Sequence, residues 1–190
     1  MKLFTLDLYA QINSGDEDVA LAAHDEWERR NKRSRRHYKK IEAQLPEALR
    51  KFCAEQCLHD ADWNGIARLP GCTFPCNSQE IMIIACQENT LIPEFLNTFA
   101  ILQYTITSAP VFERPVQAKV FSEVQPTWLY DEIDVVCPGV FSHSILISSG
   151  LVVTIHFRDF RYFIAPLLHP TQQGAVSEER VAEVVQSASA

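Results

Sequence analysis

The chain has 190 residues, of which 47% are hydrophobic and 22% are charged, a composition typical of one soluble globular domain. Its formal net charge of −7 argues against a protein that binds nucleic acid over its whole surface. The first residues have neither the pattern of a signal peptide nor an apolar run long enough to span a membrane. We therefore expect a cytoplasmic protein that does not bind a membrane and keeps its six cysteines reduced.

The N-terminal part of the chain is predicted to be helical after a short strand or extended arm over residues 1–12. Asp16 is placed to cap a long helix that runs to about residue 44. Apolar and small side chains fall on one side of this helix, and Lys and Arg fall on the other. We expect Trp27 and Tyr38 to be buried on the apolar side as large anchors.

A second helix is predicted from Pro46 to about residue 64. Proline is tolerated in a first helical turn because the N–H that it lacks would have no partner there. Gly65 is suited to end the helix. Asp60 falls on the same apolar face as Phe52. The two predicted helices are expected to form an antiparallel hairpin.

The rest of the chain changes to short apolar runs separated by turn-forming residues, which is typical of strands. The predicted fold class is α+β, with an N-terminal helical hairpin packed on a mostly antiparallel β-sheet. We expect a single domain over residues 1–166, with a helical part at about 16–64 and a sheet at about 66–165, followed by a mobile tail over 167–190. A short helix is predicted over residues 92–98, and strands are predicted near residues 80–86, 99–107, 116–124, 128–136, 141–148 and 151–158.

Asp60 is the unusual residue of the second predicted helix, because an unpaired carboxylate on an apolar face is costly. We expect it to accept hydrogen bonds from a neighbouring loop and to act as a structural polar clamp between helix and sheet. A catalytic carboxylate is the alternative. Nearby, Cys53 and Cys57 with Cys72 and Cys76 are spaced more widely than the usual ligands of structural zinc, which favours buried thiols.

Two histidines in the C-terminal hairpin are the candidate metal ligands. A two-residue loop at residues 149–150 would pair His143 with His156 on one face of the sheet. Both could bind a metal ion if a carboxylate from residues 130–134 reached them. A metal-dependent hydrolase using His143 and His156, or Asp60, is therefore an alternative. A half-exposed polar pair is the simpler interpretation, and no cofactor is assigned.

The segment 29–40 holds eight of the chain's 17 Lys and Arg residues. Such a basic helix face can bind an acidic protein partner, the acidic remainder of another copy, or the phosphates of nucleic acid. The nucleic-acid alternative is disfavoured because no aromatic residue interleaves with the basic ones. A solvated surface is the simplest interpretation. The expected partner-binding residues are Arg29, Lys32, Arg33, Arg36 and Lys40.

Several stretches resemble uncharacterised bacterial hypothetical proteins: the KLFT start, LPEALRKF leading to LHDADW, and FSHSILISSG followed by IHFRDF. The resemblance implies a bacterial, cytosolic, single-domain protein, and it brings no catalytic residues. We therefore expect a non-enzymatic factor that binds a partner, such as an immunity-like accessory protein. A metal-dependent hydrolase and a nucleic-acid accessory protein using residues 29–40 are the alternatives.

Overall fold

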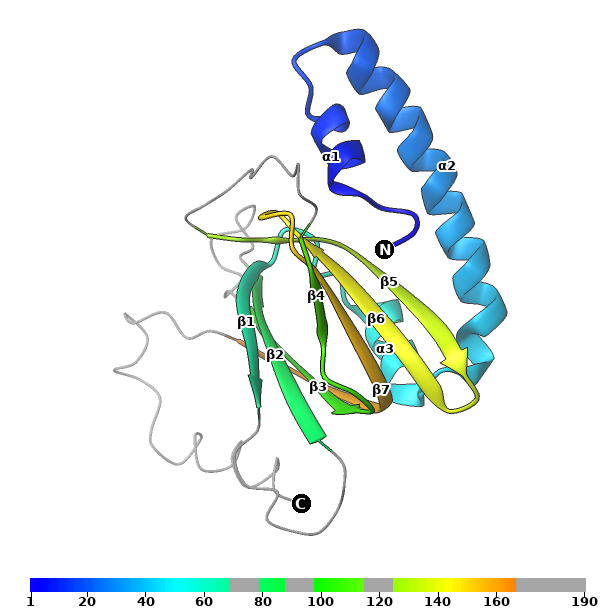
Figure 1. Ribbon diagram of the computed structural model, residues 1–190, viewed down its shortest axis with the longest axis vertical. Coiled ribbons are helices and arrows are strands. Elements are labelled where there is room, and N and C mark those ends of the chain that lie inside the picture. The colour runs from blue at the N-terminus through cyan, green and yellow to red at the C-terminus, as the bar shows by residue number, and fades with distance from the viewer. Residues whose placement is uncertain (69–78, 88–97, 115–124, 167–190) are drawn as a thin grey trace.

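The computed structural model describes residues 1–68, 79–87, 98–114 and 125–166. It confirms the predicted α+β class, with N-terminal helices placed against an antiparallel sheet (Figure 1). No helix within these described ranges is long and apolar enough to cross a membrane. The helical elements are α1 (Leu6–Ile12), α2 (Glu17–Ile41), the 3₁₀ helix η1 (Glu42–Gln44) and α3 (Glu47–Glu55).

Helix α1 replaces most of the arm or strand predicted over residues 1–12. The Thr5 hydroxyl caps this helix by accepting a hydrogen bond from the N–H of Leu8 at 3.3 Å. Leu6 and Leu8 are both buried. A spacing of two residues places side chains on one face of a strand but about 200° apart on a helix, so the pattern favours a strand, whereas α1 buries two sides. Packing of α1 against α2 decides between the two, so the helical hairpin of Figure 1 consists of α1 and α2.

Helix α2 begins where the sequence predicts. The Asp16 carboxylate accepts hydrogen bonds from the N–H groups of Asp18 and Val19 at 3.1 and 3.3 Å. The helix is lightly packed, since Ala23 and Ile41 are its buried residues. The predicted anchors Trp27 and Tyr38 are half-buried rather than buried, because α2 lies along an edge of the sheet and does not cover its face.

The second predicted helix ends at Glu55, well before residue 64. Asp60 has a φ of 65° and lies in a turn, and Gly65 lies inside the first strand at an irregular register. Backbone hydrogen bonds explain the early end. The Asp60 N–H donates to the carbonyl of Trp128 at 2.8 Å, so this segment pairs with a distant strand.

The sheet order is β1-β2-β3-β7-β6-β5, with β4 paired to β7, and every pairing is antiparallel. Predicted strands overlap with β2, β3, β5, β6 and β7, whereas β1 and β4 were not predicted. Two predicted segments lie outside the described residues, namely the strand over 116–124 and the tail over 167–190. The helix predicted over 92–98 also lies outside them, except for residue 98, which begins β3. The strands are β1 (Asp62–Arg68), β2 (Gln79–Gln87), β3 (Thr98–Ile106), β4 (Val111–Glu113), β5 (Trp128–Cys137), β6 (Val140–Ile147) and β7 (Val152–Pro166).

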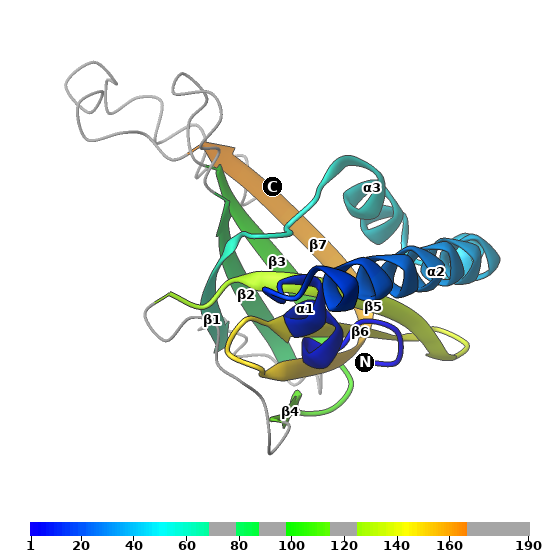
Figure 2. The same ribbon diagram turned by 90° about the horizontal axis from the view of Figure 1, so that it is seen from above.

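The two outer strands of this order meet at one end, so the sheet curls into a barrel-like layer (Figure 2). Asp62 and Thr127 form an isolated antiparallel bridge. Next to it, the Trp128 N–H donates to the carbonyl of Ala61 at 2.8 Å. These bonds join the start of β1 to the start of β5 and bring the two ends of the strand order together.

The main core fills the hollow of the curled sheet. Leu102, Phe157 and Phe160 are at most 1% exposed, and Leu49 and Phe52 of α3 pack into the same cluster. A smaller cluster lies on the other face of the sheet, where α1 buries its apolar side. Helix α3 therefore closes the hollow while α1 covers the outside of the sheet.

Candidate functional site

The C-terminal hairpin does not bring His143 and His156 together. The sheet pairs His143 with Ile155 and Ser142 with His156. The turn spans three residues and ends at Gly150 with a φ of 82°, whereas the prediction used two residues. A register change of one residue moves a side chain to the opposite face. His143 is therefore fully buried in the core, and the proposed two-histidine metal site is not formed.

His143 instead belongs to a buried chain of hydrogen bonds. The Tyr104 hydroxyl lies 2.7 Å from Nδ1, and Nε2 lies 3.0 Å from Oδ2 of Asp131. Burial raises the pKa of Tyr104 well above its usual value, so this hydroxyl keeps its proton and donates to Nδ1. Nε2 then carries a ring proton and donates to the carboxylate, so both ring nitrogens have a hydrogen-bond partner.

Asp131 is the member of this chain that reaches solvent. Its side chain is 40% exposed, whereas that of His143 is 0% exposed. Burial alone would raise the pKa of Asp131, but the hydrogen bond from His143 and that from Trp128 Nε1, 3.4 Å from Oδ1, hold the pKa below its usual range. The buried histidine therefore fixes an ionised carboxylate in a defined orientation.

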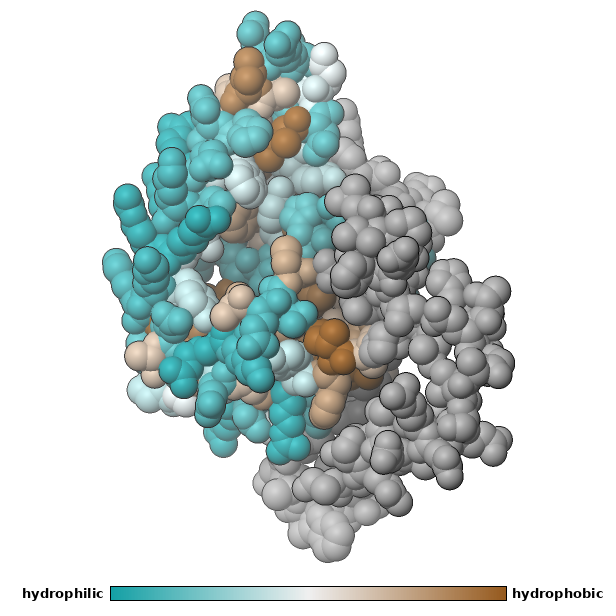
Figure 3. Space-filling view, turned by 180° about the vertical axis from the view of Figure 1, so that it is seen from behind, coloured by the Kyte–Doolittle hydropathy of each residue, from teal (hydrophilic) through white to brown (hydrophobic). Residues whose placement is uncertain are grey.

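This carboxylate lies in the wall of a cleft of about 900 Å³ between α2 and β5. The first residues of the chain and the segment that follows α3 complete the walls. Figure 3 shows a hollow between the hydrophilic column of α2 and the body of the molecule. Aromatic side chains contribute much of the lining, namely Phe4, Trp27, Tyr38, Phe52, Trp128 and Tyr130.

Tyr130 is held by aromatic contacts within this wall. Its ring stacks on Phe4 at a centroid distance of 4.9 Å and meets the His59 ring edge-on at 5.3 Å. Burial is the main reason that the pKa of Tyr130 is raised. The buried Trp27 Nε1 lies near Tyr130 without a hydrogen bond of normal geometry in the described part of the chain. Tyr130 is thus packed between two rings of the wall, with the buried Trp27 indole beside it.

Cys53 lies in the same cleft but is not an activated thiol. Burial and, to a smaller extent, the negative charge of Asp131 raise its pKa to about 12. Tyr38, which contacts the thiol, also has its pKa raised to about 12, mainly by burial. Because the thiolate is the nucleophilic form, Cys53 is unsuited to covalent catalysis at neutral pH.

The two other carboxylates of this part of β5 already have partners. Glu132 accepts hydrogen bonds from the backbone N–H groups of Lys2, Leu3 and Phe4 at 2.8, 2.7 and 3.0 Å. Asp134 pairs with Lys2 Nζ at 3.0 Å and with His37 Nε2 at 3.1 Å. These contacts fasten the N-terminal segment and α2 to the edge of the sheet.

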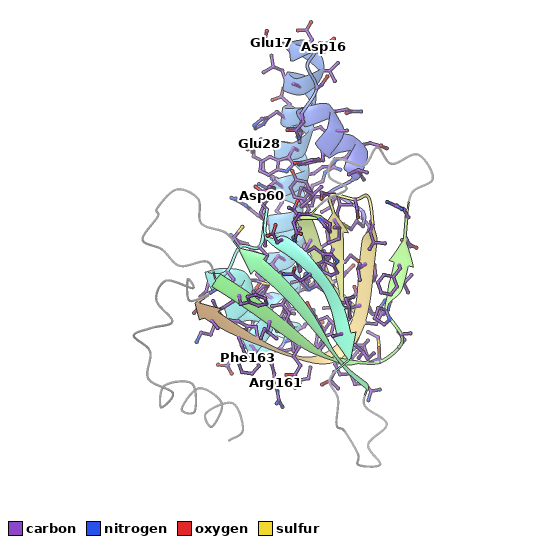
Figure 4. All side chains as sticks on the ribbon, turned by 90° about the vertical axis from the view of Figure 1, so that its left-hand side faces the viewer. Asp16, Glu17, Glu28, Asp60, Arg161 and Phe163 are labelled. Atoms are coloured by element: carbon purple, nitrogen blue, oxygen red, sulfur yellow. The ribbon has the colours of Figure 1, made fainter. Side chains whose placement is uncertain are left out.

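Asp60 is not on a helix face, and the premise of the predicted polar clamp is wrong. Its side chain is 71% exposed, and Oδ2 lies 2.9 Å from Nδ1 of the neighbouring His59. Figure 4 places Asp60 at the end of the sheet, away from Asp16 and Glu17 at the free end of α2. Its backbone, rather than its carboxylate, joins it to the sheet.

The predicted basic residues all lie on α2 and are exposed. Arg29 pairs with Glu26 at 3.0 Å, and Lys32 pairs with Glu28 at 3.8 Å. The other predicted members form no ion pair with any residue that the structure describes; they are Arg33, Arg36 and Lys40. The structure therefore divides the basic stripe into charges matched within the helix and charges open to solvent.

The described residues contain no cluster of three or more metal-ligating side chains. Cys53 and Cys57 are free thiols, and Cys72 and Cys76 lie outside the described residues. A zinc site made of all four of these cysteines, which their spacing disfavours, therefore stays untested.

Sequence reasoning named the segment 130–134 as a source of a carboxylate for a histidine, but it did not single out Asp131 or Tyr104. Compared with protein-family models, with curated proteins and with solved structures, the chain gives no match. The geometry of the cleft is thus the basis for an assignment of function.

Proposed function

We propose that this chain is a non-enzymatic binding protein whose cleft between α2 and β5 holds a small organic molecule. The observation that carries the proposal is the Asp131 carboxylate, fixed by the buried His143 and presented in the cleft wall. Ligand sites are typically concave, rich in aromatic side chains and supplied with a few oriented polar groups. Their usual volume is roughly 300–1,000 Å³, and the cleft of about 900 Å³ lies within that range.

Binding is favoured over catalysis by the protonation states of the groups in the cleft. An efficient general base has a pKa near the working pH, but the pKa of Asp131 is lowered and that of Cys53 is raised to about 12. Both nitrogens of His143 are already used in hydrogen bonds. None of these three groups is poised to move a proton or to attack a substrate, so the cleft is suited to recognition.

The indole N–H signals of the protein provide a direct test. Trp27 and Trp128 line the cleft, whereas Trp63 lies in the core of the sheet and does not line it. We expect NMR titration with neutral 2-phenylethanol to move the Trp27 and Trp128 indole signals with one saturable dissociation constant. A dissociation constant of about 10 mM corresponds to a binding free energy near 3 kcal/mol. If 2-phenylethanol at up to about 10 mM gives no saturable shift, the result would contradict binding of small organic molecules in the cleft.

A variant that fills the cleft separates it from other surfaces. Ser34 lines the cleft from α2, so Ser34→Phe should abolish the titration. Lys32→Phe introduces the same ring on the exposed side of α2 and should leave the dissociation constant unchanged. Equal effects of both variants would place the bound molecule elsewhere.

The open charges on α2 favour a second candidate, an immunity-like factor that docks an acidic protein. Arg36 and Lys40 are exposed and lack an ion pair among the described residues, unlike Arg29 and Lys32. An unpaired Lys or Arg gains a new ion pair when it meets a carboxylate of a partner. A Lys or Arg that is already paired within α2 would first have to give up its ion pair in the helix. The remainder of the protein is acidic, which disfavours a nucleic acid on the same surface.

Fluorescence anisotropy with a labelled peptide of ten glutamates tests this candidate. Charge reversal of Arg36 and Lys40 to glutamate should weaken the peptide at least about tenfold. The same reversal of Arg29 and Lys32 should have a smaller effect, since their charges are already shared with Glu26 and Glu28. Tighter binding of a single-stranded oligothymidylate than of the peptide would favour the nucleic-acid alternative.

A cytoplasmic location in a bacterial cell is part of this proposal. The cytoplasmic part is supported by the described thiols, because Cys53, Cys57 and Cys137 are all free and reducing compartments keep cysteines in that form. The bacterial part rests on the sequence resemblance alone.

A further inference from the structure

We propose that the ligand of the cleft carries a positively charged amino group that pairs with Asp131. This inference rests on the proposed function and names the class of ligand, a small amine with an apolar body. It follows from the charges, the geometry and the aromatic lining of the cleft.

The charge balance of β5 singles out Asp131. Both oxygens of Glu132 are occupied by three backbone N–H donors, and Asp134 pairs with the Lys2 ammonium and lies within hydrogen-bond distance of His37. Asp131 has His143 and Trp128 as hydrogen-bond donors, but no Lys or Arg in the described part of the chain forms an ion pair with it. A carboxylate in a cleft wall without a Lys or Arg partner among the described residues favours a ligand that supplies a cation.

The carboxylate is also oriented before a ligand arrives. His143 holds Oδ2, and its own position is fixed by the Tyr104 hydroxyl 2.7 Å away. A carboxylate has about four acceptor sites, and these donors leave the exposed side of the group unused. Because the side chain is 40% exposed and its rotamer is already held, an ammonium group can bind without reorganising the wall.

Aromatic rings near Asp131 favour a cation as well. The Trp128 indole donates to Asp131, and Tyr38 and Tyr130 line the same cleft. Cations are attracted to the faces of such rings within about 6 Å, Trp most strongly. Arg33, Arg35 and Lys39 also border the cleft, but they are exposed, so water and salt screen their repulsion of an amine more than they screen Asp131.

A matched pair of probes tests the inference on the wild-type protein. The probes 2-phenylethylamine and 2-phenylethanol have nearly the same shape, but the amine is charged at neutral pH. Hydrogen bonds to charged groups contribute about 1.5–3 kcal/mol, so we expect the amine to bind at least about tenfold more tightly at pH 7. The shifts of the Trp128 indole signal report both affinities without any substitution.

Two variants assign the preference to one carboxylate. Asp131→Asn keeps the size of the side chain and should remove the preference for the amine. Asp134→Asn neutralises another carboxylate that borders the cleft but is already paired, and it should keep the preference. Near-UV circular dichroism checks that each variant is folded.

The outcomes separate this inference from the proposed function. Equal affinities for the two probes would overturn the amine preference while leaving a small-molecule cleft in place. Saturable binding of neither probe would overturn both. A tenfold preference that survives Asp131→Asn would show that another group recognises the amine, and it would overturn the role of Asp131.

Discussion

Removing one hydroxyl group tests the buried chain that positions Asp131. Tyr104→Phe deletes the donor 2.7 Å from Nδ1 of His143 and leaves the aromatic ring in place against Phe157 and Phe160. No cavity of side-chain size forms, so the main effect is an imidazole nitrogen left buried without a donor. Such an unsatisfied group costs about 1–3 kcal/mol. We expect the free energy of unfolding to fall by that amount.

Urea denaturation followed by far-UV circular dichroism measures this change, and an unchanged slope with urea concentration shows that compactness is preserved. Tyr162→Phe is the matched control, because its hydroxyl bonds Glu55 at the surface at 3.2 Å. Loss of such an exposed bond should change stability by less than about 0.5 kcal/mol. If both variants lose the same stability, the Tyr104 hydroxyl has no special role and the proposed orientation of Asp131 loses its basis.

Three further predictions concern titration, reactivity and a turn. The pKa of Asp131 is lowered in the folded protein, so its contribution to stability is present above the unfolded pKa near 3.9 and is lost as the pH falls through the folded value. When urea unfolding is measured between pH 7 and pH 3, the free energy of unfolding should therefore fall less for Asp131→Asn than for the wild type. Iodoacetamide at pH 8 should modify exposed Cys57 at least about tenfold faster than Cys53, whose pKa is about 12, as judged by mass spectrometry; equal rates would contradict the burial of Cys53. Gly139→Ala should lower the free energy of unfolding by about 1 kcal/mol because the φ of Gly139 is 75°. Gly15 lies in open space without a positive φ, so Gly15→Ala should change the same free energy by less than about 0.5 kcal/mol.

Local patterns in the sequence were sufficient for the start of α2 and for most strands. Asp16 followed by acidic residues predicts a helix start whose geometry the structure confirms. The long apolar runs predict strands because burial on a pleated surface requires them. Both features depend on neighbours in the chain, and distant contacts do not change them.

The boundary of α3 was not predictable in this way. The apolar spacing of a helix continues from Phe52 through Trp63, but residues 60–63 instead bond to the backbone at residues 126–128. Closure of the curled sheet thus outweighs local helical periodicity. A pairing partner more than sixty residues away cannot be recognised from the spacing of apolar residues in this segment.

The predicted register of the C-terminal hairpin is wrong for a related reason. The residues Ser148, Ser149 and Gly150 suit a two-residue loop as well as the three-residue loop that is observed. One residue of difference moved His143 from the expected metal pair to the core. Tyr104 was equally hidden, because β7 separates β3 from β6 in the sheet, and its contact with His143 crosses the hollow of the curled layer.

The buried chain itself argues for a role at the cleft. Replacing buried polar groups with apolar residues of similar size is often neutral or stabilising, so stability alone does not require Tyr104 and His143 in a core made of Leu, Ile and Phe. Both are fully buried and reach the surface through a single carboxylate. Their hydrogen bonds fix the charge state and the direction of Asp131, which an apolar core would leave free. The benefit of the chain is therefore greatest where Asp131 meets a ligand.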